Sequence, residues 1–334
     1  MRRSLAPSDW TSTARGSLVY HRPMKQGQAS RTAEYVALFR AIESSLPPER
    51  RLFEDPYARR FLGPRLALVA WACRLPGVAD LASRFIDRRW AGARSSAVAR
   101  TRFIDDAIQD AVVRGAKQLV ILGAGFDSRA YRLRSLRNVT IFEVDHPSTS
   151  AAKQSIVRRA LRGAPSNVQF VVTDFHEGEL GPAMDQAGYS KSVATFILWE
   201  GVTPYLTSAA VDTTLRWCSE AATGSQLLFT YVHRAVIDAP ERFAGTQRLF
   251  ATLRDAGETW QFGIDPTELS DFLNTRGLRL DRDTGSAEYR ARYLSQAAEA
   301  TIGYQFYRIA SATVISPGHH APPESQEAPP TVSR

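Results

Sequence analysis

Cysteine is scarce in this chain, and its scarcity excludes several kinds of protein. Only Cys73 and Cys218 occur in 334 residues, too few for a disulfide framework or a cysteine-rich metal cluster. Both lie in apolar, helix-like surroundings, so we expect them to be buried free thiols. No grouping of histidines and acids has the spacing of metal ligands, and we expect no bound metal.

Long apolar runs are also absent. The longest, around residues 66–72, is far shorter than the roughly 20 residues that span a bilayer. The first residues lack the apolar core of a secretory signal. We therefore expect a cytoplasmic protein without membrane contact. A hydrophobic content of 44% and a charged content of 23% are typical of a globular protein with a sizeable core.

Positive charge is concentrated at one end of the chain. Residues 1–31 hold six basic residues and one acid, and so carry more than half of the net charge of +8. Nucleic-acid binding requires a basic face with interleaved aromatic residues, whereas the remaining chain is nearly neutral. We predict no nucleic-acid partner, a flexible basic arm over residues 1–29 and a disordered, Pro-rich tail over residues 316–334.

The most informative stretch begins with a short apolar run. Leu119–Leu122 is β-branched and apolar, and it stops at the sequence Gly123, Ala124, Gly125. This pattern predicts a buried strand that enters a tight glycine turn. Glycines at such a turn let a ligand approach the backbone closely.

A second predicted strand, residues 139–144, ends beside an acid. Asp145 follows it, and an acid in this place can accept hydrogen bonds from the two hydroxyls of a ribose. A dinucleotide fingerprint would have a third glycine where this chain has Ser128. A shortened glycine turn suits an adenosyl ligand without a pyrophosphate, and S-adenosylmethionine is such a ligand.

Strands and helices alternate along the rest of the chain. Arg100 and Thr101 are predicted to open a helix, with Thr101 as its N-cap. Asp265 and Pro266 are predicted to open another helix. The remaining predicted helices cover residues 30–42, 147–161, 207–222 and 286–300. Further strands are predicted over residues 168–173, 193–199, 226–232, 278–280 and 304–315. This alternation predicts a parallel, doubly wound α/β sheet with helices on both faces.

The same pattern suggests how the chain is divided. Residues 30–99 are predicted to form a helical N-terminal cap, and residues 100–315 are predicted to form the domain that binds the nucleotide. Residues 233–264 have weak periodicity and read as an insertion or lid within that domain. No internal repeat is visible.

Several ordered motifs together resemble the leucine carboxyl methyltransferase family. They are A-R-T-R-F, L-G-A-G-F-D-S-R, F-E-V-D-H-P, T-D-F and W-E-G-V-T-P-Y-L, preceded by S-R-T-A-E-Y-V-A-L-F-R-A-I-E and L-F-E-D-P-Y-A. The resemblance covers about residues 29–315 and is strongest to bacterial O-methyltransferases of small molecules and polyketides. It implies a class I methyltransferase fold with a mostly parallel, seven-stranded sheet.

The resemblance also implies which residues hold S-adenosylmethionine. Gly123, Ala124 and Gly125 would pass beneath the cofactor, and Asp145 would hold its ribose. At the adenine, Asp174 would bind the exocyclic amine and Phe175 would supply apolar contact.

At the amino-acid end of the cofactor, Arg100 would pair with the methionine carboxylate. Arg40 is a second candidate for this carboxylate, in a looser match to the family. Glu200 would lie near the methionine amino group, since an acid after an apolar strand is costly unless it is paired. Asp127 and Arg129 are expected to form a local ion pair.

The expected reaction is methyl transfer to a carboxylate or acidic hydroxyl of a small molecule. A carboxylate acceptor needs mainly orientation and desolvation, whereas a phenol needs a base. Tyr205 and His233 follow predicted strands and are the catalytic candidates; His233 is the candidate base. The alternatives are methylation of a protein C-terminal carboxylate, a silent cofactor-binding partner protein and an NAD(P)-dependent oxidoreductase. The oxidoreductase is disfavoured by Ser128.

Overall fold

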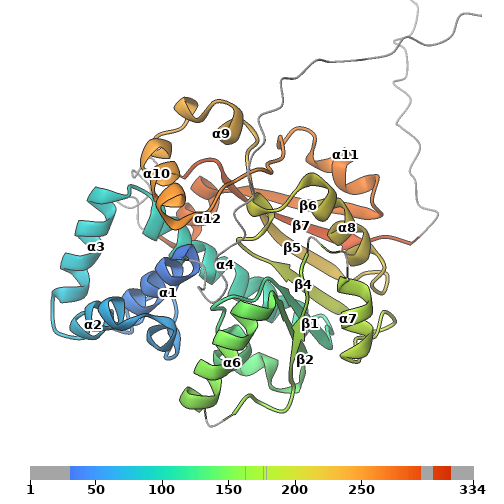
Figure 1. Cartoon of the computed structure of the whole chain (residues 1–334), viewed down its shortest axis with the longest axis horizontal. Coiled ribbons are helices and arrows are strands. Elements are labelled where there is room, and N and C mark those ends of the chain that lie inside the picture. Colours follow the sequence, from blue (N-terminus) through green and yellow to red (C-terminus); the bar gives the residue numbers. More distant parts are fainter. Residues whose placement is uncertain (1–30, 162, 176, 178, 295–303, 317–334) are drawn as a thin grey trace, which may run out of the picture.

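A central sheet with helices on both faces forms the body of the molecule (Figure 1). The computed structural model describes residues 31–161, 163–175, 177, 179–294 and 304–316. The predicted arm over residues 1–29 and the predicted tail beyond residue 316 lie outside this part of the chain.

The sheet has seven strands in the order β3-β2-β1-β4-β5-β7-β6. The strands are β1 Gln118–Leu122, β2 Thr140–Asp145, β3 Val168–Val172, β4 Thr195–Trp199, β5 Gln226–Val232, β6 Leu278–Gly285 and β7 Tyr307–Val314. β1 to β5 are parallel, and β7 runs antiparallel to both β5 and β6. The expected doubly wound, mostly parallel seven-stranded sheet is confirmed. Because β1 to β5 are parallel, the residues after them meet at one edge, where open α/β sheets bind ligands.

Side-chain alternation along β1 divides the core into two layers. Val120 and Leu122 belong to one apolar layer, and Leu119 and Ile121 belong to the other. The first layer is covered by α7 Leu180–Gln186, α8 Ser208–Ser219 and α11 Leu269–Asn274. The second layer is covered by α4 Ala93–Val113, α5 Arg129–Arg132, η2 Arg134–Asn138 and α12 Ser286–Tyr293. α6 Pro147–Leu161 follows β2, with the bounds that the sequence predicts.

The residues before α4 are largely helical and share a small apolar core of their own. These helices are α1 Arg31–Glu43, η1 Ala58–Phe61, α2 Pro64–Ala72 and α3 Val78–Arg89. Cys73 lies in this core and Cys218 in the first sheet layer, and both are buried free thiols as expected.

Two predicted helix starts are wrong. α4 begins at Ala93, so Arg100 lies about two turns inside it, and the Thr101 hydroxyl donates to the Ala97 carbonyl rather than capping the helix. The Ala- and Ser-rich first turns have no clear apolar stripe, so periodicity could not reveal them. Asp265 accepts from the amide of Thr267 in a turn, and α11 begins only afterwards.

Residues 233–264, predicted as an insertion, contain α9 Ala235–Asp238, η4 Pro240–Arg242 and α10 Thr246–Ala256. Their apolar side chains pack with Trp260 and Phe306 into a separate cluster. α9 and α10 lie beyond the carboxyl end of β5, and α10 lies beside the N-terminal helices (Figure 1). α1 and α10 contact each other directly.

The turn after β1 requires glycine on steric grounds. Gly123 has φ +65° and Gly125 φ +40°, in the left-handed region that other residues rarely adopt. A Cβ on Gly123 would come within 2.2 Å of Cγ2 of Val202 in the loop after β4. The backbone of this turn therefore packs directly against the neighbouring strand's loop.

We predict that Gly123→Ala destabilises the protein more than Gly224→Ala does. Gly224 also has a positive φ, +86°, but a Cβ there meets no atom within 4 Å. Both changes incur the left-handed strain of about 1–2 kcal/mol, and only the first adds a clash. Val202→Ala should recover part of the Gly123→Ala loss in a double-mutant cycle measured by chemical unfolding. Equal losses at the two glycines would contradict the steric argument.

Candidate cofactor site

Asp145 binds the glycine turn from the end of β2. Its Oδ2 accepts from the Gly125 amide at 2.5 Å, and its Oδ1 accepts from the His146 amide at 2.7 Å. Each carboxylate oxygen keeps a further lone pair for a ligand hydroxyl. Burial raises the pKa of Asp145, and the two amides oppose that shift. The arrangement suits a ribose with two neighbouring hydroxyls.

Asp174 lies at the adjacent strand end. Asp145 pairs with Val172 in the sheet register, and Asp174 follows β3 two residues later. The Asp174 carboxylate lies 4.0 Å from Nε2 of His146, and Phe175 packs against the first core layer. The structure thus brings the expected ribose and adenine residues to neighbouring positions on one edge of the sheet.

Glu200 forms the opposite end of the site. It follows β4, and its two oxygens accept from Arg100 Nε at 2.7 Å and Arg129 Nη1 at 2.8 Å. The Arg100 guanidinium also lies over the Tyr307 ring, 4.6 Å from the ring centroid. Burial disfavours the charge of Glu200, but Arg129 and Arg100 hold its pKa below the ordinary value. Glu200 is therefore a partly buried anion at neutral pH, with 15% of its side chain exposed.

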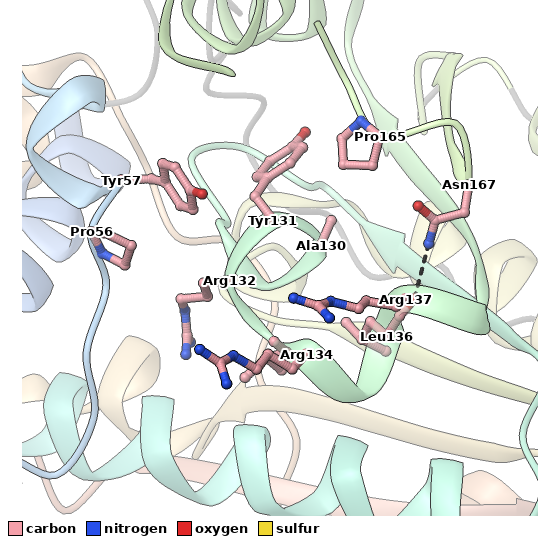
Figure 2. A pocket seen from close by; sticks show the side chains of 11 residues that line it. Pro56, Tyr57, Ala130, Tyr131, Arg132, Arg134, Leu136, Arg137, Pro165 and Asn167 are labelled. Carbon is pink, nitrogen blue, oxygen red and sulfur yellow. Dashed lines mark hydrogen bonds between the residues drawn. The ribbon is translucent and has the colours of Figure 1, made fainter. Parts of the chain in front are cut away.

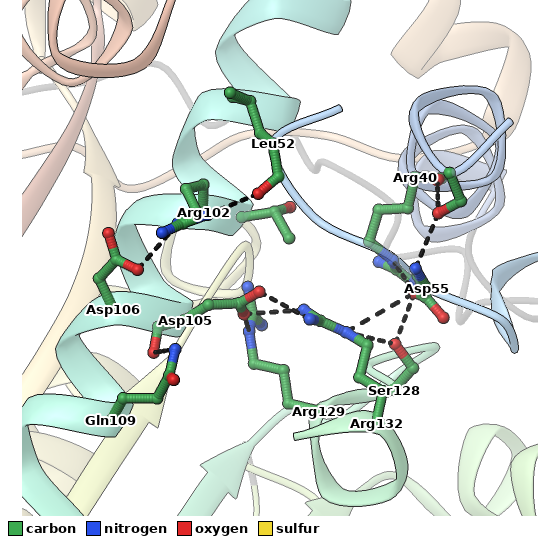
Figure 3. A network of polar contacts seen from close by, with 12 residues as sticks. Arg40, Leu52, Asp55, Arg102, Asp105, Asp106, Gln109, Ser128, Arg129 and Arg132 are labelled. Atoms are coloured by element: carbon green, nitrogen blue, oxygen red, sulfur yellow. Dashed lines mark hydrogen bonds and ion pairs between the residues drawn. The ribbon is translucent and has the colours of Figure 1, made fainter. Parts of the chain in front are cut away.

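Arg129 is the centre of a wider ion network than the sequence predicted (Figure 3). The expected pair with Asp127 is present, and the Asp127 pKa is about 2 because Arg129 and nearby cations outweigh burial. Arg129 also pairs with Asp105 at 2.8 Å, and Asp105 pairs with Arg132 at 2.6 Å. Asp105 was missed because a single acid on an amphipathic helix gives no signal in the sequence.

Arg40 supports the glycine turn from α1. Its Nε donates to Asp55 at 2.9 Å and its Nη2 donates to the Phe126 carbonyl at 2.5 Å. Asp55 also accepts from the Ser128 hydroxyl at 2.6 Å. The side chain that replaces the third glycine thus ties the turn to the helical cap, and Arg40 lies next to the expected site.

A second buried pair lies beneath the site. Glu143 on β2 is paired with Lys153 of α6 at 2.8 Å and accepts from the Tyr131 hydroxyl at 2.7 Å. Burial raises the pKa of Glu143 against the effect of both partners. The Lys153 ammonium also donates to the Ala124 carbonyl at 3.2 Å, so this pair holds the turn from below.

The two catalytic candidates lie in different surroundings. Tyr205 follows Glu200 in the short helix η3 Thr203–Tyr205 and contacts Trp260 edge to face, with ring centroids 6.5 Å apart. His233 lies in the turn that leads into α9. Its Nδ1 accepts from the Ala235 amide, and its ring contacts Phe243. These side-chain contacts of His233 are with other residues of the insertion.

A cavity of about 440 Å³ lies elsewhere, between the N-terminal helices and the residues before β2 and β3 (Figure 2). Its wall includes Tyr57, Arg134, Arg137, Pro165 and Asn167. Leu136 and Asn167 precede the amino ends of β2 and β3, opposite the edge where Asp145 lies. This cavity is therefore separate from the candidate cofactor site.

Two features are absent from the part of the chain that the structure describes. No group of three or more His, Cys, Asp or Glu side chains is close enough to hold a metal ion there. Of the helices described, none has the length and apolarity required to cross a membrane.

The chain is an α/β protein whose strand order reverses between β1 and β4, the place where open α/β sheets bind ligands, and the candidate cofactor site lies there. A family profile described as leucine carboxyl methyltransferase matches residues 33–219. The chain therefore belongs to the leucine carboxyl methyltransferase family, and it is an S-adenosyl-L-methionine-dependent methyltransferase.

Relatives by sequence agree with this assignment. A Streptomyces coelicolor protein, named as a candidate S-adenosyl-L-methionine-dependent methyltransferase, is 36% identical over 64% of this chain and 71% of its own length. A Mycobacterium sp. (strain JLS) protein with the same description is 28% identical over 84% of this chain and 94% of its own.

Solved structures share the fold. A candidate methyltransferase from Thermobifida fusca covers 89% of this chain and 100% of its own, with a TM-score of 0.53 and 14% identity. A DUF574 family protein from Streptomyces avermitilis covers 86% of this chain and 98% of its own, with a TM-score of 0.55 and 12% identity. At these identities the likeness concerns the fold alone.

We predict that Asp145→Ala weakens the binding of S-adenosylhomocysteine at least tenfold, about 1.4 kcal/mol, because the carboxylate would accept hydrogen bonds from the ribose hydroxyls. Asp185→Ala on the exposed side of α7 is the matched control and should bind as the wild type does. Calorimetric titration of the three proteins tests this. Equal affinities would exclude Asp145 as the ribose anchor.

The affinity should also depend on pH in one direction. The pKa of Asp145 is raised above the ordinary value of about 3.9, so acidification protonates Asp145 before an ordinary aspartate. Wild-type affinity for S-adenosylhomocysteine should be constant near neutrality and fall as the pH approaches this raised pKa. In Asp145→Ala this fall in affinity at acidic pH should disappear. If the variant shows the same fall, protonation of another group causes it.

Proposed function

We propose that this chain transfers the methyl group of S-adenosylmethionine to an oxygen of a small molecule, either a carboxylate or an acidic hydroxyl. The observation that carries the proposal is the contact between the N-terminal helices and the insertion, which would cover the methionine side of the site. The Thr32 hydroxyl of α1 donates to Glu258, and Arg248 of α10 donates to the Arg89 carbonyl at the end of α3. Such a cover favours a small acceptor over the tail of a folded protein.

The residues present fit the cofactor. Asp145 offers one lone pair from each oxygen to the ribose, and Asp174 with Phe175 would frame the adenine. Arg100, with Arg40 as the second candidate, would hold the methionine carboxylate, and Glu200 would lie near the amino group. When bound, S-adenosylmethionine supplies a methyl group on a positively charged sulfur.

The protein's own side chains would position the acceptor beside that methyl group and keep water away from it. Orientation of the acceptor and exclusion of water account for much of the rate enhancement that such a displacement needs. The aromatic cluster under the insertion would exclude water. Burial first, and then the charge of Glu258, raise the pKa of Tyr205. Tyr205 would therefore act as a neutral hydroxyl that orients the acceptor.

His233 is the alternative catalytic residue. Its Nδ1 accepts from the Ala235 amide, so Nε2 carries the proton of the neutral ring. His233 would act as a base only if its Nδ1 gave up that amide and the ring changed its tautomer. A partly structural role in the turn before α9 fits its contacts equally well.

The position of the transferred methyl group tests the proposed function. The protein is incubated with methyl-labelled S-adenosylmethionine and a set of phenols and aromatic carboxylic acids. We expect label in a small-molecule product. A methyl ester releases labelled methanol in mild base, whereas an aryl methyl ether does not. Label on nitrogen, on carbon or only on a protein would overturn the proposal.

We predict that Tyr205→Phe lowers kcat/KM for the acceptor about tenfold, the cost of one lost hydrogen bond of about 1.4 kcal/mol. Affinity for S-adenosylhomocysteine should not change. His233→Gln, tested beside it, decides the second candidate, because loss of a base should cost at least about 100-fold in kcat. If Tyr205→Phe leaves turnover unchanged, the orienting role is wrong.

A further inference from the structure

An exposed apolar surface lies on α2 and α3. Within the described residues, eight large hydrophobic side chains are exposed, and six of them lie between residues 64 and 89. These six side chains, the α2–α3 surface, are Leu68, Val69, Trp71, Leu75, Leu81 and Phe85. Exposed apolar side chains that gather in this way mark a site of interaction, whereas single ones need no explanation.

Neither helix uses these side chains in the core. Every residue of α2 except Pro64 and Arg65 is apolar, yet only Ala70 is buried. On α3, Leu81 and Phe85 share one face because they are four residues apart, and they are 68% and 65% exposed. A helix that is apolar on all sides normally lies in a core or in lipid. α2 is therefore too apolar for a helix that faces only water.

The charges on these two helices are mainly basic. Residues 64–89 contain five arginines, all of them exposed, and two acids. The acids, Asp80 and Asp87, form salt bridges with Arg50 and Arg94, which lie outside this segment. The five arginines therefore keep their charge for an anionic partner.

Charge also decides against two other ways of covering this surface. In a symmetric dimer formed through it, the arginines of one copy would face those of the other. Residues 1–30 contain five basic residues and one acid, so the chain's own N-terminal segment would be repelled as well. α1, which follows that segment, contacts both α2 and α3. The basic segment thus joins the fold at the helix that packs on both.

Position and composition favour a bilayer over an acidic protein as the partner. α2 and α3 lie at the outer margin of the molecule (Figure 1). Leucine is under-represented among the residues that dominate protein interfaces, and those residues lie in well-packed pockets. Leucine, phenylalanine and tryptophan beside arginine are instead typical of helices that lie in the headgroup region of a membrane.

We propose that α2 and α3 bind the surface of a bilayer that contains anionic phospholipids. The six apolar side chains would enter the headgroup region of one leaflet, and the arginines would lie against the phosphates. The short apolar runs of the sequence led to the expectation of no membrane contact, because such runs do not show whether a helix leaves its apolar side chains outside the core. Binding of this kind does not depend on which acceptor is methylated.

Sedimentation of the full-length protein with vesicles tests this proposal. One set of vesicles is phosphatidylcholine, and the other is an equimolar mixture of phosphatidylcholine and phosphatidylglycerol. We expect the anionic vesicles to bind the protein at least about tenfold more strongly, and this difference to shrink as the salt concentration is raised.

Leu81→Ser removes one of the inserted side chains and should lower the affinity for anionic vesicles at least about fivefold. Val113→Ser is the matched control, because Val113 at the end of α4 is 87% exposed and lies outside the α2–α3 surface. The control should bind vesicles as the wild type does. Both variants should bind S-adenosylhomocysteine with the wild-type affinity, which shows that they are folded.

Arg84→Gln combined with Arg88→Gln tests the charges. Loss of two charges at the bilayer should lower the affinity for anionic vesicles at least about tenfold. Arg279→Gln combined with Arg282→Gln is the control and should have little effect. It removes the same charge from exposed side chains of β6, on the other side of the molecule in Figure 1.

Trp71 reports on insertion directly. Of the tryptophans in the described residues, only Trp71 is exposed. Protein fluorescence should be quenched when the anionic vesicles contain phosphatidylcholine brominated on its acyl chains. Trp71→Phe should lose most of this quenching.

A wild type that stays in solution with anionic vesicles, or that binds both kinds of vesicle equally, overturns the proposal. Binding that Leu81→Ser leaves unchanged overturns it too, since the N-terminal segment would then suffice. A wild-type dimer that Leu81→Ser dissociates would show a second copy in place of the bilayer. Retention on immobilised polyglutamate without binding to vesicles would show an acidic protein in its place. If Leu81→Ser fails to bind S-adenosylhomocysteine, the fluorescence decides, and equal quenching in Trp71→Phe overturns the proposal.

Discussion

The buried ion network around Arg129 is the interaction on which the cofactor edge of the sheet depends. Removing charges from water costs several kcal/mol per ion unless each is paired and hydrogen-bonded. Glu200 satisfies this condition only when α4, α5 and the end of β4 are all in place, since Arg100 comes from α4 and Arg129 from the start of α5. The network therefore couples the formation of the site to the assembly of the fold.

The same network connects the helical cap to the nucleotide fold. Asp55 pairs with Arg40 and accepts from Ser128, and Arg132 lies 3.9 Å from it. Burial disfavours the charge of Asp55, but Arg40 and Arg132 hold its pKa below the ordinary value. The N-terminal helices thus stabilise the glycine turn as well as covering it, and the polar residue at position 128 has a structural reason.

Local signals predicted much of the fold and some of the residues that meet at the candidate site. The β1 and β2 strands, the glycine turn and Asp145 were predictable because a buried parallel strand and the acid after it lie close together in sequence. The start of α4 was not predictable, because its Ala- and Ser-rich residues carry no periodic signal. The ion pairs of Arg129 with Asp105 and Glu200 were not predictable either, because these partners are distant from it in sequence.

The sequence by itself determined the class of fold, the family and the type of cofactor, because each depends on short motifs whose physics is local. Only the tertiary structure decided which charges meet. It paired Glu200 with two arginines and placed Glu258 against Thr32 across 226 positions of chain. Such pairings depend on how helices and loops close over the sheet. That packing is set by burial and charge neutralisation over the whole molecule, which no short stretch of sequence encodes.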